Sequence, residues 1–158
     1  MEWAGYVGVI GAGACTDSVY GLARQLGREI GKMGWVLIGG GLGGVMEGSA
    51  RGCLEAGGVT IGLLPGLEKA SANPYIKIPI PTGLDEGRNL LLVRAADVLI
   101  SIGGAYGTLS EIALALKMNK PVVGLETWKD IHGVHYVSDT QEAIHWVTKF
   151  MSRKMNNC

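Results

Sequence analysis

Short apolar runs alternate along this chain with segments in which apolar residues recur every three or four positions. The short runs have the length and composition of buried strands, and the clearest are YVGVI (6–10), WVLIGG (35–40), VTIGLL (59–64), DVLISI (97–102) and PVVGL (121–125). The periodic segments predict helices over 17–33, 43–56, 85–96, 107–118 and 140–151. IKIPI (76–80) predicts one more short strand, and its Pro79 favours a place at the edge of the sheet.

Strands that are apolar throughout and separated by helices are typical of a parallel sheet with helices on both faces. We therefore expect an α/β protein of the Rossmann-like class, with a doubly wound, mostly parallel sheet and a single domain over residues 1–158. Ligands of such sheets bind beyond the carboxyl ends of the strands. In this chain the glycine-rich turns fall at those ends.

Composition narrows the classes of function. The 26 glycines cluster at strand ends, which indicates tight turns and close approach of the backbone to a ligand. Lysine plus arginine and aspartate plus glutamate number 14 each, and zero net charge argues against a nucleic-acid partner. We find no run of transmembrane length and no signal-peptide pattern, so we expect a cytoplasmic protein without a membrane partner. The three cysteines lack paired or metal-like spacing, which predicts neither a disulfide framework nor a metal site.

The first glycine-rich turn is Gly11-Ala12-Gly13-Ala14-Cys15-Thr16. It is not a dinucleotide fingerprint, because Thr16 stands at the third glycine position. Two interpretations remain open: Gly11 and Gly13 contact a phosphate or sugar, or they only allow a tight turn. Thr16 or Asp17 is expected to cap the helix that follows.

The second turn, GGGLGG (39–44), has the G-x-G-x-x-G spacing and lies between a strand and a helix. The next strand ends without the acidic residue that binds ribose in NAD enzymes, so the turn indicates an anion cradle rather than a nicotinamide site. The alternative is that its glycines serve only to pack the helix on the sheet. The residues expected to bind the anion are Gly40, Gly41, Gly43 and Gly44.

The third turn, 103–111, also opens a helix, and the free N–H groups of a helix N-terminus attract phosphate. The candidates for phosphate binding there are Gly104, Tyr106, Gly107 and Thr108.

Arg88 and Glu111 are the charged candidates, and each has an ordinary alternative. Glu111 lies about one turn into helix 107–118, where an acid is also stabilised by the helix dipole. Arg88 lies near the start of helix 85–96, where a surface ion pair with Asp85 or Glu86 is the alternative.

These motifs resemble the LOG-like family, the phosphoribohydrolases that activate cytokinins, over about residues 6–125. The resemblance rests on GGGLGGVMEGSARGCLEAGGVTIGLLP (39–65) and on the block 88–111. Three positions depart from the family pattern. Gly103 and Ala105 replace a proline and a glycine of the usual PGGxGTxxE motif, and Asn89 replaces a lysine. These three departures count against hydrolase activity, but they do not affect the predicted binding site.

The resemblance implies roles for the charged residues. Arg88 would hold the phosphate or ribose of a nucleoside 5′-monophosphate. Glu111 would polarise the ribose or activate water at the anomeric carbon, releasing base and ribose 5-phosphate. Backbone N–H groups of 41–44 and 104–108 would bind the phosphate. No cofactor is needed for this reaction.

ANPY (72–75), IPI (78–80), TGL (82–84) and the block 88–117 resemble a smaller branch of the family, which includes molybdenum cofactor carrier proteins. That branch implies binding of a phosphorylated pterin, the molybdenum cofactor, without transforming it. We therefore expect a protein that binds a phosphate-bearing small molecule, with phosphoribohydrolase activity as the alternative. Residues 126–158 diverge from the family. Family members are commonly oligomers, and the apolar helix 107–118 fits a homodimer or homotetramer.

Overall fold

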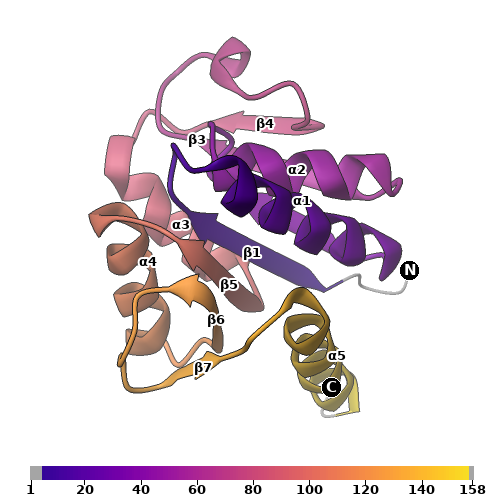
Figure 1. Ribbon diagram of the computed structural model, residues 1–158. Helices are drawn as coiled ribbons and strands as arrows, with labels where there is room; N and C mark the ends of the chain where they lie inside the picture. Colours follow the sequence, from indigo (N-terminus) through magenta and orange to yellow (C-terminus); the bar gives the residue numbers. More distant parts are fainter. Residues whose placement is uncertain (1–4, 157–158) are drawn as a thin grey trace.

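The computed structural model describes residues 5–156, in which strands and helices alternate as predicted (Figure 1). The strands are β1 (Tyr6–Gly11), β2 (Val36–Gly39), β3 (Val59–Leu64), β4 (Ile78–Pro81), β5 (Val98–Gly103), β6 (Val122–Thr127) and β7 (Val134–Tyr136). The helices are α1 (Asp17–Lys32), α2 (Val45–Glu55), α3 (Arg88–Ala95), α4 (Tyr106–Lys117) and α5 (Thr140–Asn156). Short 3-10 turns, η1 (Lys69–Ser71) and η2 (Asp85–Gly87), lie in the connection from β3 to α3.

The strands form one parallel sheet in the order β4-β3-β2-β1-β5-β6-β7. From β1 the chain first builds outward through β2, β3 and β4, and then returns to the other side of β1 with β5. The strand order therefore reverses between β1 and β5, which is the switch point where doubly wound sheets bind ligands.

Alternate side chains of the sheet enter two apolar cores, one on each face. Val7 and Val9 of β1 pack under α1, α2 and α5, whereas Ile10 and its neighbours pack under α3 and α4. Figure 1 shows α1, α2 and α5 on one side of β1 and α3 and α4 on the other. Both faces are thus covered, which explains why the central strands are apolar without alternation.

Most of the predicted elements are confirmed, with small shifts at their ends. The strand expected at 76–80 is β4, at the edge of the sheet, and the side chain of Thr16 caps α1. The predicted helix 85–96 divides into η2 and α3. The sequence patterns predict no strand between residues 125 and 140, yet β7 lies there, and its His135 stacks on Trp146 with ring centroids 5.2 Å apart. Three residues are too short a run to show strand periodicity.

Helices α1 and α2 pack so closely that glycine is required at their contact. A Cβ on Gly27 would lie 1.9 Å from the carbonyl oxygen of Ser49, and a Cβ on Gly52 would lie 1.9 Å from that of Arg24. Gly21, in the same helix as Gly27, is exposed and has no atom within 4 Å of the Cβ position. The glycines of α1 therefore have different roles.

We predict opposite effects of alanine at these two positions of α1. Gly27→Ala forces the helices apart and lowers the free energy of unfolding by about 1–3 kcal/mol or more. Gly21→Ala raises it by roughly 0.5–1 kcal/mol, because alanine restricts the unfolded chain and favours helix. Urea unfolding of the two variants measures both values. Equal effects at the two positions would contradict the close approach of α1 and α2.

Candidate functional site

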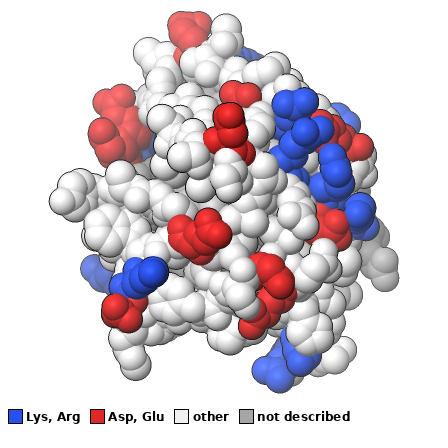
Figure 2. Space-filling view, in the orientation of Figure 1, with Lys and Arg blue, Asp and Glu red and all other residues white. Residues whose placement is uncertain are grey.

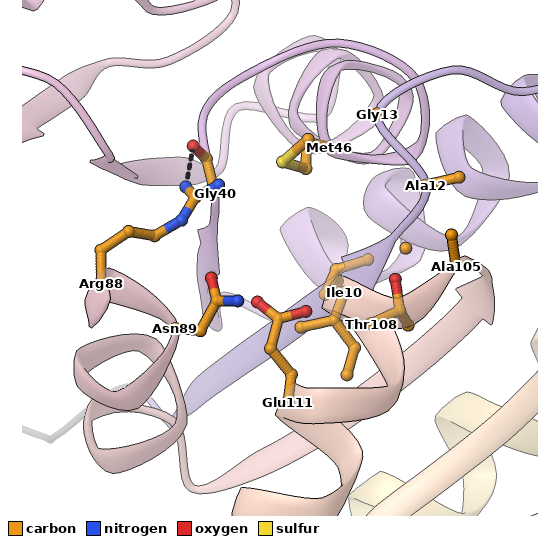
Figure 3. A pocket seen from close by; sticks show the side chains of 13 residues that line it. Ile10, Ala12, Gly13, Gly40, Met46, Arg88, Asn89, Ala105, Thr108 and Glu111 are labelled. Atoms are coloured by element: carbon orange, nitrogen blue, oxygen red, sulfur yellow. Dashed lines mark hydrogen bonds between the residues drawn. The ribbon is translucent and has the colours of Figure 1, made fainter. Parts of the chain in front are cut away.

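A cavity of about 200 Å³ opens at the switch point of the sheet (Figure 3). Its walls come from the end of β1 and the turn after it, from the end of β2, and from the first turns of α2, α3 and α4. The lining residues are Val9, Ile10, Gly11, Ala12, Gly13, Gly40, Met46, Arg88, Asn89, Ala105, Gly107, Thr108 and Glu111.

The cavity brings together both charged candidates and part of each glycine turn. The predicted site residues that line it are Gly11, Gly13, Gly40, Arg88, Gly107, Thr108 and Glu111. The predicted residues outside its lining are Gly41, Gly43, Gly44, Gly104 and Tyr106. The lining residues that the sequence did not indicate as binding residues are Val9, Ile10, Ala12, Met46 and Asn89, whereas Ala105 falls within the predicted phosphate-binding backbone 104–108. For Asn89 a signal was present, since it follows Arg88 in the helix that opens onto the cavity.

Several of the glycines outside the lining serve close packing. A Cβ on Gly44 would lie 2.2 Å from the carbonyl oxygen of Ala12, and one on Gly43 would lie 2.9 Å from that of Gly13. The first two glycine turns therefore lie back to back. A Cβ on Gly104 would lie 2.4 Å from the side chain of Thr108, in the first turn of α4. At these positions the packing interpretation accounts for the glycine.

The helix N-termini at this edge of the sheet differ in how their N–H groups are satisfied. In α1, the hydroxyl of Thr16 accepts a hydrogen bond from the Val19 N–H at 3.3 Å. In α2, the first N–H, from Val45, donates to the Ala12 carbonyl at 3.0 Å. Helix α4 begins after Ala105, and within residues 5–156 no side chain caps it. Its first turn borders the cavity, so α4 presents its partial positive charge to a ligand there.

Arg88 lies along one side of the cavity instead of forming a surface ion pair. Its Nη1 donates to the carbonyl oxygen of Gly40 at 2.5 Å (Figure 3). The same atom donates to the carbonyl oxygen of Leu63 at 2.5 Å, and the two bonds tie α3 to the ends of β2 and β3. A Cβ on Gly40 would lie 2.6 Å from this nitrogen, so glycine is needed for the contact. Burial lowers the pKa of Arg88, and Glu111 opposes that shift. A guanidinium keeps its charge at neutral pH, so Arg88 is a fixed cation.

Glu111 lies on the wall of the cavity, with only 7% of the residue exposed. Among residues 5–156 no group donates a hydrogen bond to its carboxylate. A capping acid would lie in the first turn of α4, and Glu111 lies past that turn. Burial raises the pKa of this carboxyl to about 7, although the positive charge of Arg88 opposes the shift. Near neutral pH the group therefore exists in both forms and is able to give or take a proton.

Tyr106 stands outside the lining, on the surface. It is 80% exposed, and its ring lies 6.0 Å from that of Trp128. The indole N–H of Trp128 donates to the Ala105 carbonyl at 3.2 Å. This pair connects the end of β6 to the start of α4, beside the cavity.

Basic side chains gather away from the cavity. Figure 2 shows the main group of them at one side of the molecule, over α1 and α2, with smaller basic groups toward the bottom of the view and acidic groups scattered between them. Arg24, Arg28 and Arg51 all pair with Glu55, at 2.8–3.0 Å.

None of the helices in residues 5–156 combines the length and apolar character needed to span a membrane. In the same residues no group of three potential ligands from His, Cys, Asp and Glu is placed to hold a metal ion.

We predict that Glu111 destabilises the protein above neutral pH. The pKa of Glu111 is raised from 4.5 to about 7 in the folded state. Between these two pH values the carboxyl is protonated in the folded protein and ionised in the unfolded chain. The free energy of unfolding therefore falls as the pH rises from about 4.5 to about 7. Glu111→Gln removes this loss and raises the free energy of unfolding at pH 8 by up to about 3 kcal/mol relative to the wild type.

The measurement is urea unfolding at pH 5 and pH 8. The gain from Glu111→Gln should be larger at pH 8, whereas Glu68→Gln, an exposed loop position, should give the same small change at both. A pH-independent effect of Glu111→Gln would show that the carboxyl is not perturbed.

The chain matches known proteins over almost its whole length. The family model described as SLOG cluster4 covers residues 4–153. An uncharacterized protein of Archaeoglobus fulgidus is 44% identical over 140 residues, which are 89% of this chain and 92% of that protein.

Solved structures agree with this relationship. The molybdenum cofactor binding protein of Rippkaea orientalis has a TM-score of 0.89 and 34% identity, covering 96% of this chain and 99% of that one. The molybdenum cofactor carrier protein of Chlamydomonas reinhardtii has a TM-score of 0.87 and 36% identity, with the same coverage. DNA processing protein A of Helicobacter pylori, at 24% identity and a TM-score of 0.70, shares the fold. The chain therefore belongs to the SLOG cluster4 family, a LOG-like branch of the Rossmann-like proteins.

Proposed function

We propose that this protein binds a phosphate-bearing small molecule in the cavity at the switch point, and that it acts as a carrier of the molybdenum cofactor. The observation that carries the proposal is the joint placement of the uncapped N-terminus of α4 and the Arg88 guanidinium on one cavity. Both attract an anion, and a helix N-terminus supplies N–H donors for phosphate oxygens.

The N-termini of α1 and α2, which follow the first two glycine turns, are poorer phosphate sites. Thr16 and the Ala12 carbonyl already accept N–H groups of α1 and α2. We therefore place the phosphate at Ala105, Gly107 and Thr108, with Gly11, Gly13 and Gly40 as the facing backbone.

The relatives supply the identity of the ligand. The proteins of Rippkaea orientalis and Chlamydomonas reinhardtii are named for binding or carrying the molybdenum cofactor, and their chains align with this one almost end to end. That cofactor bears a phosphate, which fits the anion end of the cavity.

The cavity is smaller than the ligand it would serve. At about 200 Å³ it falls below the roughly 300–1,000 Å³ typical of sites that enclose a whole small molecule. We therefore place the phosphate and the adjoining ring inside, with the rest of the ligand outside the cavity. A ligand held by one end suits a carrier, because the exposed part remains available for transfer.

Hydrolysis of nucleoside 5′-monophosphates is the second candidate, and one observation favours it. Glu111 is a buried carboxyl with a pKa of about 7, lining the same cavity as a fixed arginine. A carboxyl poised near the working pH is suited to acid–base catalysis at a sugar. This arrangement would serve release of the base from ribose 5-phosphate.

The anion site predicts a large effect of Arg88. Arg88→Ala should weaken binding of the molybdenum cofactor, supplied anaerobically from a molybdoenzyme, by about 10- to 100-fold, since a hydrogen bond to a charged group contributes about 1.5–3 kcal/mol. Arg94→Ala removes an exposed arginine from the same helix and should leave affinity unchanged. Equal losses in both variants would indicate nonspecific attraction and contradict the site.

A second prediction separates the carrier from the hydrolase. Glu111→Gln keeps the shape and hydrogen-bonding capacity of the side chain but removes its acid–base function. The carrier hypothesis predicts cofactor affinity within a few fold of the wild type and no release of base from nucleoside 5′-monophosphates by either protein. The hydrolase hypothesis predicts release by the wild type that falls by on the order of a hundredfold or more in the variant. Chromatography of the released base measures this, and release by the wild type would displace the carrier hypothesis.

A further inference from the structure

The polar groups of the cavity that lack hydrogen bonds lie together on one wall. Asn89 of α3 is 8% exposed and Glu111 of α4 is 7% exposed. Figure 3 shows their side chains turned toward one another from the two helices. In residues 5–156 the one side-chain atom that is both buried and without a hydrogen-bond partner is Nε of Arg88. The polar atoms of Asn89 and Glu111 have no hydrogen-bond partner in the described protein and are open to the cavity, where solvent or a ligand reaches them.

Such groups are costly to a folded protein. A buried amide or carboxyl gives up hydrogen bonds to bulk water, and most buried polar groups recover them from the protein. Asn89 recovers none from the described chain, and no side chain caps α3, so this residue does not serve its own helix. Residues kept at such a cost are frequent at binding sites, where a ligand supplies the missing bonds.

The rest of the cavity restricts what that ligand group is. Apart from Arg88, Thr108 and the Asn89–Glu111 pair, the lining consists of backbone and apolar side chains, including Ile10, Ala12 and Met46. Arg88, already engaged by the Gly40 and Leu63 carbonyls, is the one cation of the lining, and Glu111 is the one acid. The Asn89–Glu111 wall therefore suits an uncharged group with an apolar face and an edge of hydrogen-bond donors and acceptors.

The position of this wall relates the group to the phosphate. Glu111 follows Thr108 by three residues on α4, a rise of about 4.5 Å along the helix. Asn89 faces Glu111 from the neighbouring helix (Figure 3). A group held there lies beside the phosphate site and is joined to the phosphate by a very short link.

We infer that Asn89 is a specificity-determining residue, which together with Glu111 hydrogen-bonds a ring joined to the bound phosphate by a single carbon. The inference rests on the proposed function, because it takes the phosphate to lie at the start of α4. The shared chemistry is an oxygen heterocycle bearing a phosphomethyl group. Ribose 5-phosphate units of nucleotides and the pyran ring of the phosphorylated pterin both have it.

The test separates a binding role from a structural one. Asn89→Leu replaces the amide by an apolar side chain of similar size. If the amide serves the ligand, the variant should have a Tm equal to or about 2–4 °C above that of the wild type, because an unpartnered polar group has been removed. A structural role predicts a lower Tm. Gln141→Leu makes the same kind of change at an exposed position of α5 and serves as the control.

Binding is then measured by calorimetry with three probes: inorganic phosphate, ribose 5-phosphate, and tetrahydrofurfuryl phosphate, which has the ring and link of ribose 5-phosphate without hydroxyls. The wild type should bind ribose 5-phosphate more tightly than the other two. Asn89→Leu should lose about tenfold in affinity for ribose 5-phosphate and nothing for inorganic phosphate. A parallel titration with the molybdenum cofactor shows whether a pterin-linked ring is held by the same residue.

Each result decides a different point. If Asn89→Leu lowers the affinity for all three phosphate probes equally, Asn89 contacts the phosphate itself. If it leaves all three affinities unchanged, Asn89 contacts no part of the ligand. Either result overturns the inference. Equal binding of the hydroxylated and bare rings by the wild type overturns it as well, while the phosphate site stands. If the wild type binds no phosphate probe and no cofactor, the proposed function fails and the inference with it. Loss confined to ribose 5-phosphate identifies a nucleotide ligand, and loss extending to the cofactor identifies the pterin.

Discussion

The contact between the first two glycine turns determines the shape of the site. The Val45 N–H donates to the Ala12 carbonyl, and the missing side chains of Gly43 and Gly44 let the two backbones approach. This contact satisfies the start of α2 from within the protein and aligns the ends of β1 and β2. A fixed floor results, across which α3 and α4 face one another at the switch point.

That floor distinguishes the helices that follow the glycine turns. In α1 and α2 one N–H of the first turn has a partner outside the helix, whereas no side chain caps α4, which follows the sharply turned Gly103-Gly104, with φ of 57° and 109°. Residues with a side chain rarely adopt such positive φ angles, so glycine is favoured at both positions. The turn lets α4 begin directly at the cavity, and Arg88 closes the opposite side through its hydrogen bonds to the ends of β2 and β3.

The site is arranged at a cost to stability. Asn89 and Glu111 are largely buried and Arg88 is half-buried, and within residues 5–156 the hydrogen bonds of these three side chains are confined to Nη1 of Arg88. The Nε of Arg88 is buried without a partner. The rise in the pKa of Glu111 is one sign of this cost. Two well-packed apolar cores, one on each face of the sheet, supply the stability that tolerates it.

The sequence-based predictions succeed where the physics is local. Apolar runs and helical periodicity identified every element except β7, whose three residues are too few to show a pattern. The motif spacing also brought Arg88 and Glu111 forward as a pair, and both line the cavity. Spacing did not distinguish glycines that line the cavity, such as Gly11 and Gly40, from those that pack turn against turn, such as Gly44. That distinction depends on which backbone lies opposite, and the opposing residue is more than thirty positions away in the chain.

By itself, then, the amino-acid sequence determined the alternation of strands and helices, the parallel sheet covered on both faces, and the edge at which the glycine-rich turns gather, because these follow from patterns within a few residues. Tertiary structure alone decided that a cavity opens at the start of α4, that Arg88 is fixed by the Gly40 and Leu63 carbonyls, and that Asn89 and Glu111 face one another without partners in the described protein. Hydrogen-bond satisfaction and burial are properties of groups that meet in space, and segments distant in sequence meet only when the sheet has formed.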